Sequence, residues 1–245
     1  MKTTIRTFKD YGDMSLNAAR FIVSTARKCV GRDGFFTLVL SGGSTPVGMY
    51  RLLADKPFRD SMPWEATHLF WGDERCVPPD HTDSNYRSVN EACISKVPVP
   101  TANIHRIRGE MGDAKEAAEI YEKEIRDFFR KCDVDYCSPP QFHLILLGVG
   151  GDGHTASLFP GGGPLSEEVR WVLSARAPYG IRPGSRITMT LPIINRAERI
   201  LFLVSGEDKR NVLGRILGET PGDEVLPAGR VRADGETLWY LAFEL

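Results

Sequence analysis

The stretch that decides the fold is Phe142-His-Leu-Ile-Leu-Leu-Gly-Val-Gly-Gly-Asp-Gly-His-Thr-Ala-Ser-Leu-Phe-Pro160. It opens with a short, uniformly apolar run over residues 144–147, which is typical of a strand covered on both faces of a parallel sheet. Glycines follow at 148, 150, 151 and 153, so the backbone can turn sharply beside a ligand. Asp152 and His154 then stand at the carboxyl end of the strand, where open α/β sheets bind their ligands. An imidazole with a carboxylate two residues away is suited to general-base catalysis.

Two other interpretations fit parts of this stretch. Gly148, Gly150 and Gly153 spell the G-x-G-x-x-G fingerprint of dinucleotide binding. That fingerprint requires a long helix directly afterwards, whereas Pro160 and glycines at 161–163 follow here, so the context disfavours a nicotinamide cofactor. A plain glycine turn with a solvated histidine is the second interpretation. It does not explain why small and polar residues follow so apolar a strand.

The patterns on either side of this stretch predict an α/β protein. Helical spacing over residues 14–30, with Asp13 or Ser15 as the cap, precedes a buried-strand pattern at 35–40. A long charged helix is expected at 114–132. Further strand patterns lie at 67–71, 171–175, 187–191, 200–204 and 238–243, the last of which is expected to close the sheet. Because no repeat or linker interrupts them, we expect a single domain over residues 1–245.

The composition excludes several classes of function. With 42% apolar and 26% charged residues, the chain has the make-up of an ordinary globular protein. Its net charge of −1 provides no basic field for nucleic acid, so an anionic ligand needs a local pocket. The sequence shows neither a signal peptide nor an apolar run of membrane-spanning length, which predicts a cytoplasmic protein without a membrane partner. The cysteines at 29, 76, 93, 132 and 137 form no C-x-x-C pair and are expected to be reduced, mostly buried thiols.

Two other predicted strands also end in small and polar residues. Ser41-Gly-Gly-Ser-Thr-Pro46 follows the strand at 35–40, with Thr45 expected as the helix cap and Pro46 at the first helical position. Amides and hydroxyls at a helix N-terminus form an anion site, although this one lacks the Gly-Lys-Ser/Thr ending of a Walker A loop. The alternative is an ordinary strand-to-helix turn. Gly72-Asp-Glu-Arg75 follows the strand at 67–71, and a polar loop at 77–87 is expected to edge the same cleft.

These motifs resemble those of the 6-phosphogluconolactonase family, in the expected order over nearly the full chain. The matching segments are Ser41-Gly-Gly-Ser-Thr-Pro46, Trp71-Gly-Asp-Glu-Arg75, Asp83-Ser-Asn85, residues 147–161, Arg186-Ile-Thr-Met-Thr190, Lys209 and Leu226-Pro-Ala228. The resemblance implies a Rossmann-like fold with a mostly parallel sheet and helices on both faces. It implies hydrolysis of 6-phosphoglucono-1,5-lactone to 6-phosphogluconate in the pentose phosphate pathway, without a cofactor, by a monomer or weak homodimer. One departure lies near Ala242, where the family tends to carry an aspartate, and no function is assigned there.

The related glucosamine-6-phosphate deaminases are the main rival. Their turn continues His-Ile-Ala-Phe-Asn-Glu-Pro, and the glutamate assists ring opening and proton relay. Here the same spacing places Phe159 at the position of that glutamate. A phenyl ring transfers no proton, whereas lactone hydrolysis needs only one activated water and one returned proton. The sequence therefore favours the lactonase. A phosphosugar-binding protein that has lost catalysis is a further alternative, although its expected mark, a damaged turn at 152–154, is absent.

The resemblance also implies roles for individual residues. His154 is expected to activate water, with its tautomer held by Asp152 or Asp73, while Arg75 stabilises charge on the tetrahedral oxygen. The phosphate is expected to bind at Ser41, Gly42, Gly43, Ser44, Thr45, Arg186 and Lys209. The histidines at 68, 81, 105, 143 and 154 show no metal-ligand spacing, so no metal is expected.

Overall fold

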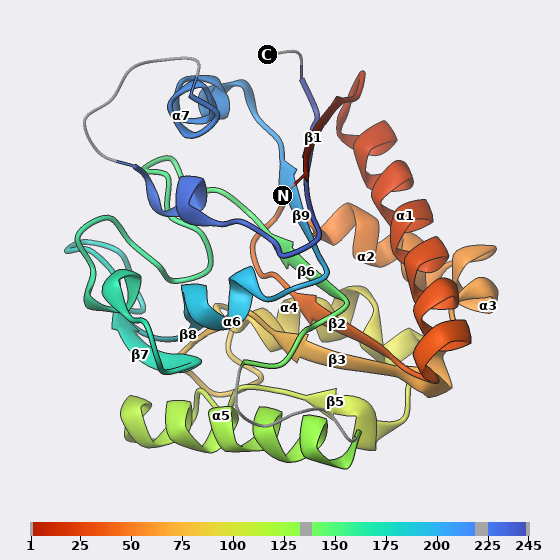
Figure 1. Cartoon of the computed structure of the whole chain (residues 1–245), viewed down its shortest axis with the longest axis horizontal. Coiled ribbons are helices and arrows are strands. Elements are labelled where there is room, and N and C mark those ends of the chain that lie inside the picture. The colour runs from red at the N-terminus through yellow and green to blue at the C-terminus, as the bar shows by residue number, and fades with distance from the viewer. Residues whose placement is uncertain (1, 133–138, 219–224, 244–245) are drawn as a thin grey trace.

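A seven-stranded parallel sheet forms the centre of the protein. The computed structural model describes residues 2–132, 139–218 and 225–243 (Figure 1). The strands of this sheet are β1 (Lys2–Thr7), β2 (Phe36–Leu40), β3 (Thr67–Trp71), β5 (Ile104–His105), β6 (Leu144–Leu147), β9 (Arg199–Val204) and β10 (Glu236–Leu241). They are arranged in the order β1-β10-β9-β6-β2-β3-β5, and every neighbouring pair is parallel. The mostly parallel sheet is thereby confirmed.

The growth of the sheet reverses direction between β2 and β6. After β2 the chain adds β3 and β5 on one side, then crosses to the other side to add β6 and β9. The loops that follow β2 and β6 therefore run in opposite directions, and a crevice opens between them outside the carboxyl ends of the strands. Open α/β sheets bind ligands at such a switch point.

Helices cover both faces of this sheet, as expected. They are α1 (Tyr11–Asp33), α2 (Val47–Ala54), α3 (Phe58–Ser61), α4 (Asn85–Ala92), α5 (Ala114–Lys131), α6 (Leu191–Asn195) and α7 (Arg210–Ile216). Figure 1 shows α1 and α2 on one side of the sheet and α5 and α6 on the other. Their apolar residues recur at helical spacing: α1 buries Ala18 and Ile22, and α5 buries Tyr121, Ile125 and Phe128.

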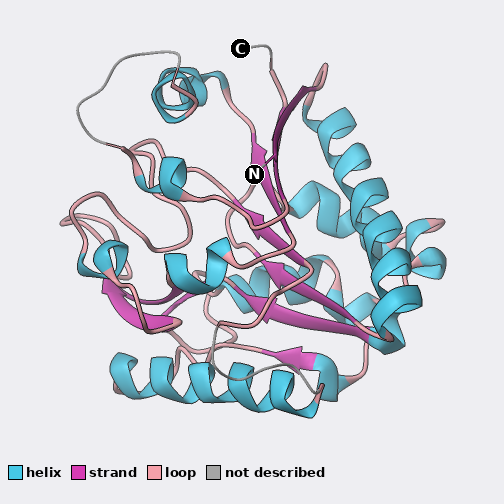
Figure 2. Cartoon of the chain, viewed as in Figure 1, coloured by secondary structure: helices cyan, strands magenta, loops and turns pink. Residues whose placement is uncertain are grey.

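A second, antiparallel sheet lies beside the first and packs against α5 (Figure 2). It consists of β4 (Asp73–Arg75), β8 (Ser185–Met189) and β7 (Val172–Arg176), in that order. The predicted strands at 171–175 and 187–191 thus belong here, because a hairpin connection can join only antiparallel neighbours. Its register places Arg75 opposite Arg186 at the edge of the crevice.

Three local expectations were wrong. The cap of α1 is Asp10, whose carboxylate accepts the Asp13 amide at 2.8 Å, rather than Asp13 or Ser15. Helix α2 begins at Val47, and no described side chain caps it; the Thr45 hydroxyl lies 3.1 Å from the Ser205 hydroxyl instead. Strand β10 does not close the sheet, because β1 pairs along its outer side.

Two remaining features concern membrane-spanning helices and the cysteine thiols. No helix in the described part of the chain is long and apolar enough to cross a membrane. The thiols of Cys29 and Cys93 are free and buried, and those of Cys76 and Cys132 are free and half-buried. Cys137 lies outside the described residues. Burial raises the pKa of the Cys29 thiol to about 11, which keeps it protonated at neutral pH.

Candidate active site

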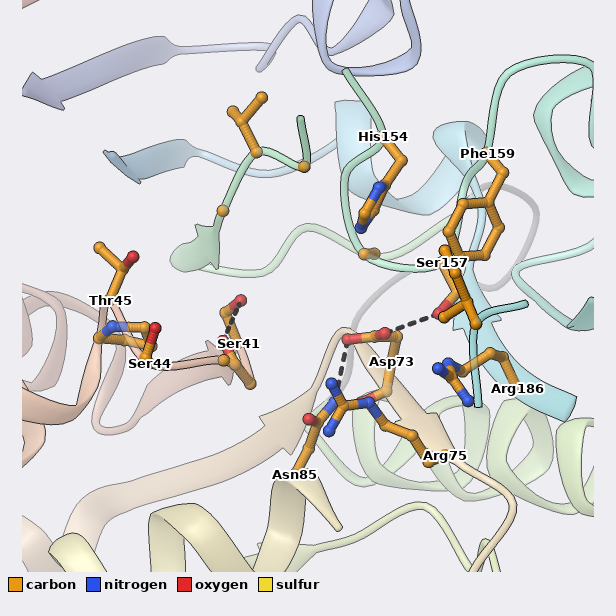
Figure 3. Close-up of a pocket in the computed structure, with 18 of the residues that line it drawn as sticks. Ser41, Ser44, Thr45, Asp73, Arg75, Asn85, His154, Ser157, Phe159 and Arg186 are labelled. Atoms are coloured by element: carbon orange, nitrogen blue, oxygen red, sulfur yellow. Dashed lines mark hydrogen bonds between the residues drawn. The ribbon is translucent and has the colours of Figure 1, made fainter. Parts of the chain in front are cut away.

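A cavity of about 350 Å³ opens at the switch point, between the carboxyl ends of the parallel strands and the small sheet (Figure 3). Its walls are Ser41, Gly42, Gly43, Ser44, Thr45, Pro46, Asp73, Arg75, Asn85, Gly148, Val149, Gly150, His154, Ala156, Ser157, Phe159, Ile181, Arg186 and Lys209. Every predicted site residue except Asp152 therefore borders one cavity. Asp152 does not line the cavity but contacts His154.

Asp152, and not Asp73, contacts the imidazole of His154. The His154 Nδ1 lies 2.6 Å from Asp152 Oδ1, and the His154 amide donates to the same oxygen at 3.1 Å. Because the carboxylate accepts a hydrogen bond from Nδ1–H, Nε2 carries the lone pair of an imidazole that borders the cavity. Burial opposes ionisation of Asp152, but the hydrogen bonds and charge of His154 outweigh it and lower the pKa of the carboxyl.

Sterics explain why glycine precedes this pair. A Cβ at Gly150 would lie 2.0 Å from His154 Nδ1 and 2.7 Å from Asp152 Oδ1. Gly153 has a φ of +82°, in the left-handed region that glycine adopts without strain. On its other side the imidazole meets the buried ring of Phe159, with 4.7 Å between the ring centroids. The turn and the Phe159 ring therefore hold the imidazole in one place.

Asp73 belongs to a different hydrogen-bond network. Its Oδ2 accepts the Ser157 hydroxyl at 2.7 Å, and its Oδ1 accepts the Asn85 carboxamide at 3.2 Å (Figure 3). The Asn85 Oδ1 is buried without a hydrogen-bond partner among the described residues, and a Cβ at Gly42 would lie 1.8 Å from it. Sequence reasoning assigned no role to Asn85 or Ser157. Both residues lie inside the motifs quoted from the sequence, and that position could have pointed to them.

Glu74 supports the site from behind and does not face the cavity. Its buried carboxylate accepts the amides of Arg75 and Asn85, each at 2.7 Å. It also accepts the Tyr86 amide at 2.8 Å and the Ser84 hydroxyl at 3.0 Å. Burial raises the pKa of Glu74 despite these bonds. Glu74 thus joins β4 to the first turn of α4 and fixes the backbone that carries Asp73 and Arg75.

Two guanidinium groups face the cavity without a carboxylate partner in the described chain. Arg75 donates to the Asp83 carbonyl at 2.6 Å, and Arg186 donates to the carbonyls of Pro183 and Ser185. Arg186 is only 5% exposed, and burial, followed by the charge of Arg75, lowers the pKa of its guanidinium. An anion would relieve this unfavourable pairing of like charges.

The predicted phosphate ligands approach the cavity from two sides. Figure 3 shows Arg186 beside Arg75, across the cavity from Ser44 and Thr45. The Lys209 ammonium also borders the cavity, 3.2 Å from the exposed carboxylate of Asp208. Hydroxyls and three cations therefore surround the cavity.

The described residues offer little to a dinucleotide or a metal. No long helix follows β6, only a turn and the short 3-10 helix Gly163–Ser166, so the dinucleotide fingerprint lacks its context. One group of possible metal ligands, Cys29, His143 and Glu198, gathers at the opposite, amino ends of the strands. Its carboxylate is already paired with Arg32 at 2.7 Å, and the Nδ1 of His143 accepts the Thr37 amide at 2.9 Å.

Comparison with known proteins identifies the family. Residues 9–239 match the model of the glucosamine-6-phosphate isomerases/6-phosphogluconolactonase family. The chain belongs to this family.

Individual members of the family are similar over almost their whole length. A probable 6-phosphogluconolactonase 2 of Arabidopsis thaliana is 40% identical over 96% of this chain and 92% of the relative. A 6-phosphogluconolactonase of Synechocystis is also 40% identical, over 90% of this chain and 87% of the relative. The crystal structure of a 6-phosphogluconolactonase from Thermotoga maritima superposes with a TM-score of 0.82 at 33% identity, covering 98% of this chain and 99% of that one. A monomeric glucosamine-6-phosphate deaminase, at 20% identity and a TM-score of 0.78, shares the fold.

Proposed function

We propose that this member of the family hydrolyses 6-phosphoglucono-1,5-lactone to 6-phosphogluconate in the pentose phosphate pathway. One observation carries the proposal: the His154–Asp152 pair borders a cavity lined by hydroxyls, by Lys209 and by two guanidinium groups that have no carboxylate partner among the described residues. The names of the relatives support the same reaction.

The chemistry requires a single base that later acts as an acid. His154 Nε2 takes a proton from water while the water oxygen attacks the lactone carbonyl carbon, and the carbonyl oxygen becomes an oxyanion. The bond from that carbon to the ring oxygen then breaks, and the imidazolium returns its proton to the ring oxygen. Asp152 accepts the hydrogen bond from Nδ1–H throughout and stabilises the imidazolium. Arg75, anchored at Asp83, faces the developing negative charge.

The phosphate orients the ring at a distance from the reacting carbon. The 41–45 loop supplies hydroxyls and amides, Arg186 a planar fork of donors, and Lys209 a point charge. Binding energy gained there can raise the rate at the carbonyl carbon. Each carboxylate oxygen of Asp73 accepts one hydrogen bond and keeps acceptor capacity, which suits a sugar hydroxyl.

The decisive experiment follows freshly prepared 6-phosphogluconolactone with and without the protein, because the lactone also hydrolyses spontaneously. Loss of lactone should accelerate in proportion to wild-type protein and should return to the spontaneous rate when His154 is replaced by glutamine. A rate independent of protein concentration would refute the proposal.

The deaminase alternative has its own test. Phe159 stands where the deaminase needs a carboxylate and packs on the catalytic imidazole. Wild-type protein incubated with glucosamine 6-phosphate should therefore release no ammonia above the protein-free control. Sustained, protein-dependent ammonia release would overturn the lactonase assignment.

Two broader expectations accompany this function. We propose that the protein acts in the cytoplasm, although a 6-phosphogluconolactonase 3 of Arabidopsis thaliana is named chloroplastic. We also propose a monomer or a weak homodimer, which sedimentation at several concentrations would test. A stable higher oligomer at micromolar concentration would contradict this expectation.

A further inference from the structure

The loop at 41–45 begins where the sheet offers it no partner. Strand β2 pairs with β3 as far as Leu40 and with β6 only at Leu38 and Val39. The backbone of Ser41 lies beyond both ladders, yet neither its N–H nor its C=O is left unpaired. The hydroxyl of Tyr50, on α2, accepts the Ser41 N–H at 3.0 Å and donates to the Ser41 C=O at 2.8 Å. One hydroxyl thus replaces the missing strand neighbour.

A second tyrosine hydroxyl holds the other end of the same loop. Tyr11, at the start of α1, accepts the Gly48 N–H at 2.8 Å and contacts the Ser44 carbonyl at 3.4 Å. A Cβ at Gly48 would lie 2.7 Å from that hydroxyl, so glycine leaves the space that the contact needs. Ser41 and Ser44 both border the cavity (Figure 3).

We propose that Tyr50 and Tyr11 are positioning residues that hold the 41–45 loop in the shape that binds the substrate phosphate. The proposal rests on the function proposed above. Donors fixed before the ligand arrives bind it more tightly, because less conformational freedom is lost on binding. Neither hydroxyl touches the ligand in this scheme. Each acts through the backbone of the loop.

Strand β3 supplies a matched control. It pairs with β5 only through Leu69 and Phe70, so Trp71 lies beyond that ladder, although it still pairs with Leu40 of β2 on the other side. The hydroxyl of Tyr121, on α5, accepts the Trp71 N–H at 2.9 Å and donates to the Trp71 C=O at 3.1 Å. Tyr50 and Tyr121 are both 1% exposed. Removing either hydroxyl leaves two backbone groups without a partner, half-buried at Ser41 and buried at Trp71, but only Tyr50 contacts the phosphate loop.

The test measures dissociation constants for 6-phosphogluconate and for unphosphorylated gluconate in Tyr50→Phe, Tyr11→Phe and Tyr121→Phe. Tyr50→Phe should raise the dissociation constant for 6-phosphogluconate about tenfold, which is the effect expected from the loss of one hydrogen bond. The dissociation constant for gluconate should change less than about twofold. Tyr11→Phe should act in the same direction by a smaller factor, because Tyr11 is 39% exposed. Tyr121→Phe should lower the melting temperature as Tyr50→Phe does, yet leave the ratio of the two constants within about twofold.

Each outcome decides the matter. The proposal would be overturned if Tyr50→Phe left the ratio of the two dissociation constants unchanged. It would also be overturned if Tyr121→Phe changed that ratio equally, because the effect would then be a general loosening of the fold. If Tyr50→Phe does not fold, an unchanged ratio in the half-exposed Tyr11→Phe would overturn it instead. A wild type without preference for the phosphorylated ligand would overturn the phosphate site itself, and with it both proposals. A preference that exists without lactone hydrolysis would remove the proposed function only.

Discussion

At position 154 three neighbours restrict one imidazole. Asp152 fixes its tautomer, Phe159 covers one side of the ring, and Gly150 leaves the space that the ring occupies. None of the three has to move for the proton to pass from water to Nε2. A base that is oriented before the substrate arrives needs no reorganisation during the reaction, which is a large part of the advantage that enzymes have over water.

Replacing His154 with glutamine tests this role. Turnover of the lactone should fall by about two to four orders of magnitude, the usual contribution of a general base. The affinity for 6-phosphogluconate should persist, since the phosphate ligands are untouched, and it serves as the internal control in a binding assay. Near-normal turnover would remove His154 from the mechanism.

Arg186 is expected to lower the stability of the ligand-free protein and to raise its affinity for the phosphorylated ligand. It is buried, faces Arg75 and has no carboxylate partner in the described chain, so its charge is unfavourable until an anion arrives. Arg186→Gln should weaken the binding of 6-phosphogluconate far more than the binding of gluconate. It should not lower the melting temperature of the ligand-free protein. Arg20→Gln, at an exposed site on α1, is the control and should change neither quantity. Equal loss of affinity for both ligands would assign Arg186 to the fold.

The turn after β6 shows how an element fixes the geometry of its residues. Gly150→Ala should drive a methyl group into the His154 imidazole, 2.0 Å from Nδ1, and so displace the ring from Asp152. Turnover should fall by about tenfold or more, because small misplacements of a catalytic group are costly. Gly151→Ala is the control: its Cβ would make an ordinary 3.6 Å contact with Lys209 Nζ. Steady-state kinetics would compare the turnover of the two variants. Equal turnover would show that the turn can accommodate a methyl group at position 150 without displacing the imidazole.

Patterns local to one element were predictable, and contacts between elements were not. The strands at 67–71 and 144–147 were predicted to the residue, because a buried parallel strand is a short apolar run bounded by polar residues. The choice between Asp152 and Asp73 as partner of His154 required the fold, since both carboxylates follow strands that reach the same crevice. The same holds for the tyrosine hydroxyls at Ser41 and Trp71, which replace ladder bonds that no sequence pattern reveals.

Across the whole molecule, stability should depend on histidines far from the cavity. The Nδ1 of His68 lies 3.2 Å from Nε2 of His105, whose Nδ1 lies 3.0 Å from Glu124. Burial, followed by the charge of His105, lowers the pKa of His68 to about 4. The unfolded chain binds this proton below about pH 6.5 while the folded protein does not, so unfolding becomes easier as the pH falls from about 6.5 to about 4.

His68→Gln should therefore make the acid-side decline in urea midpoint shallower, because one proton fewer is taken up on unfolding. Ser24→Ala, at an exposed site on α1, removes no titratable group and should keep the wild-type slope. Midpoints measured between about pH 7 and about pH 4.5 would show the difference. Parallel curves for the wild type and His68→Gln would contradict the assignment.

The pairing of β1 with β10 has a consequence for how the chain is made. Residues 2–7 lie beside 236–241 at the edge of the sheet, so β1 leaves the ribosome long before its pairing partner β10. The partners β2 and β3, by contrast, emerge early and next to each other. During translation the half of the sheet built on β2 can form while the N-terminal strand is still unpaired. A ribosome stalled before residue 236 would therefore carry a chain with the 41–45 loop in place and its first strand exposed to other nascent chains.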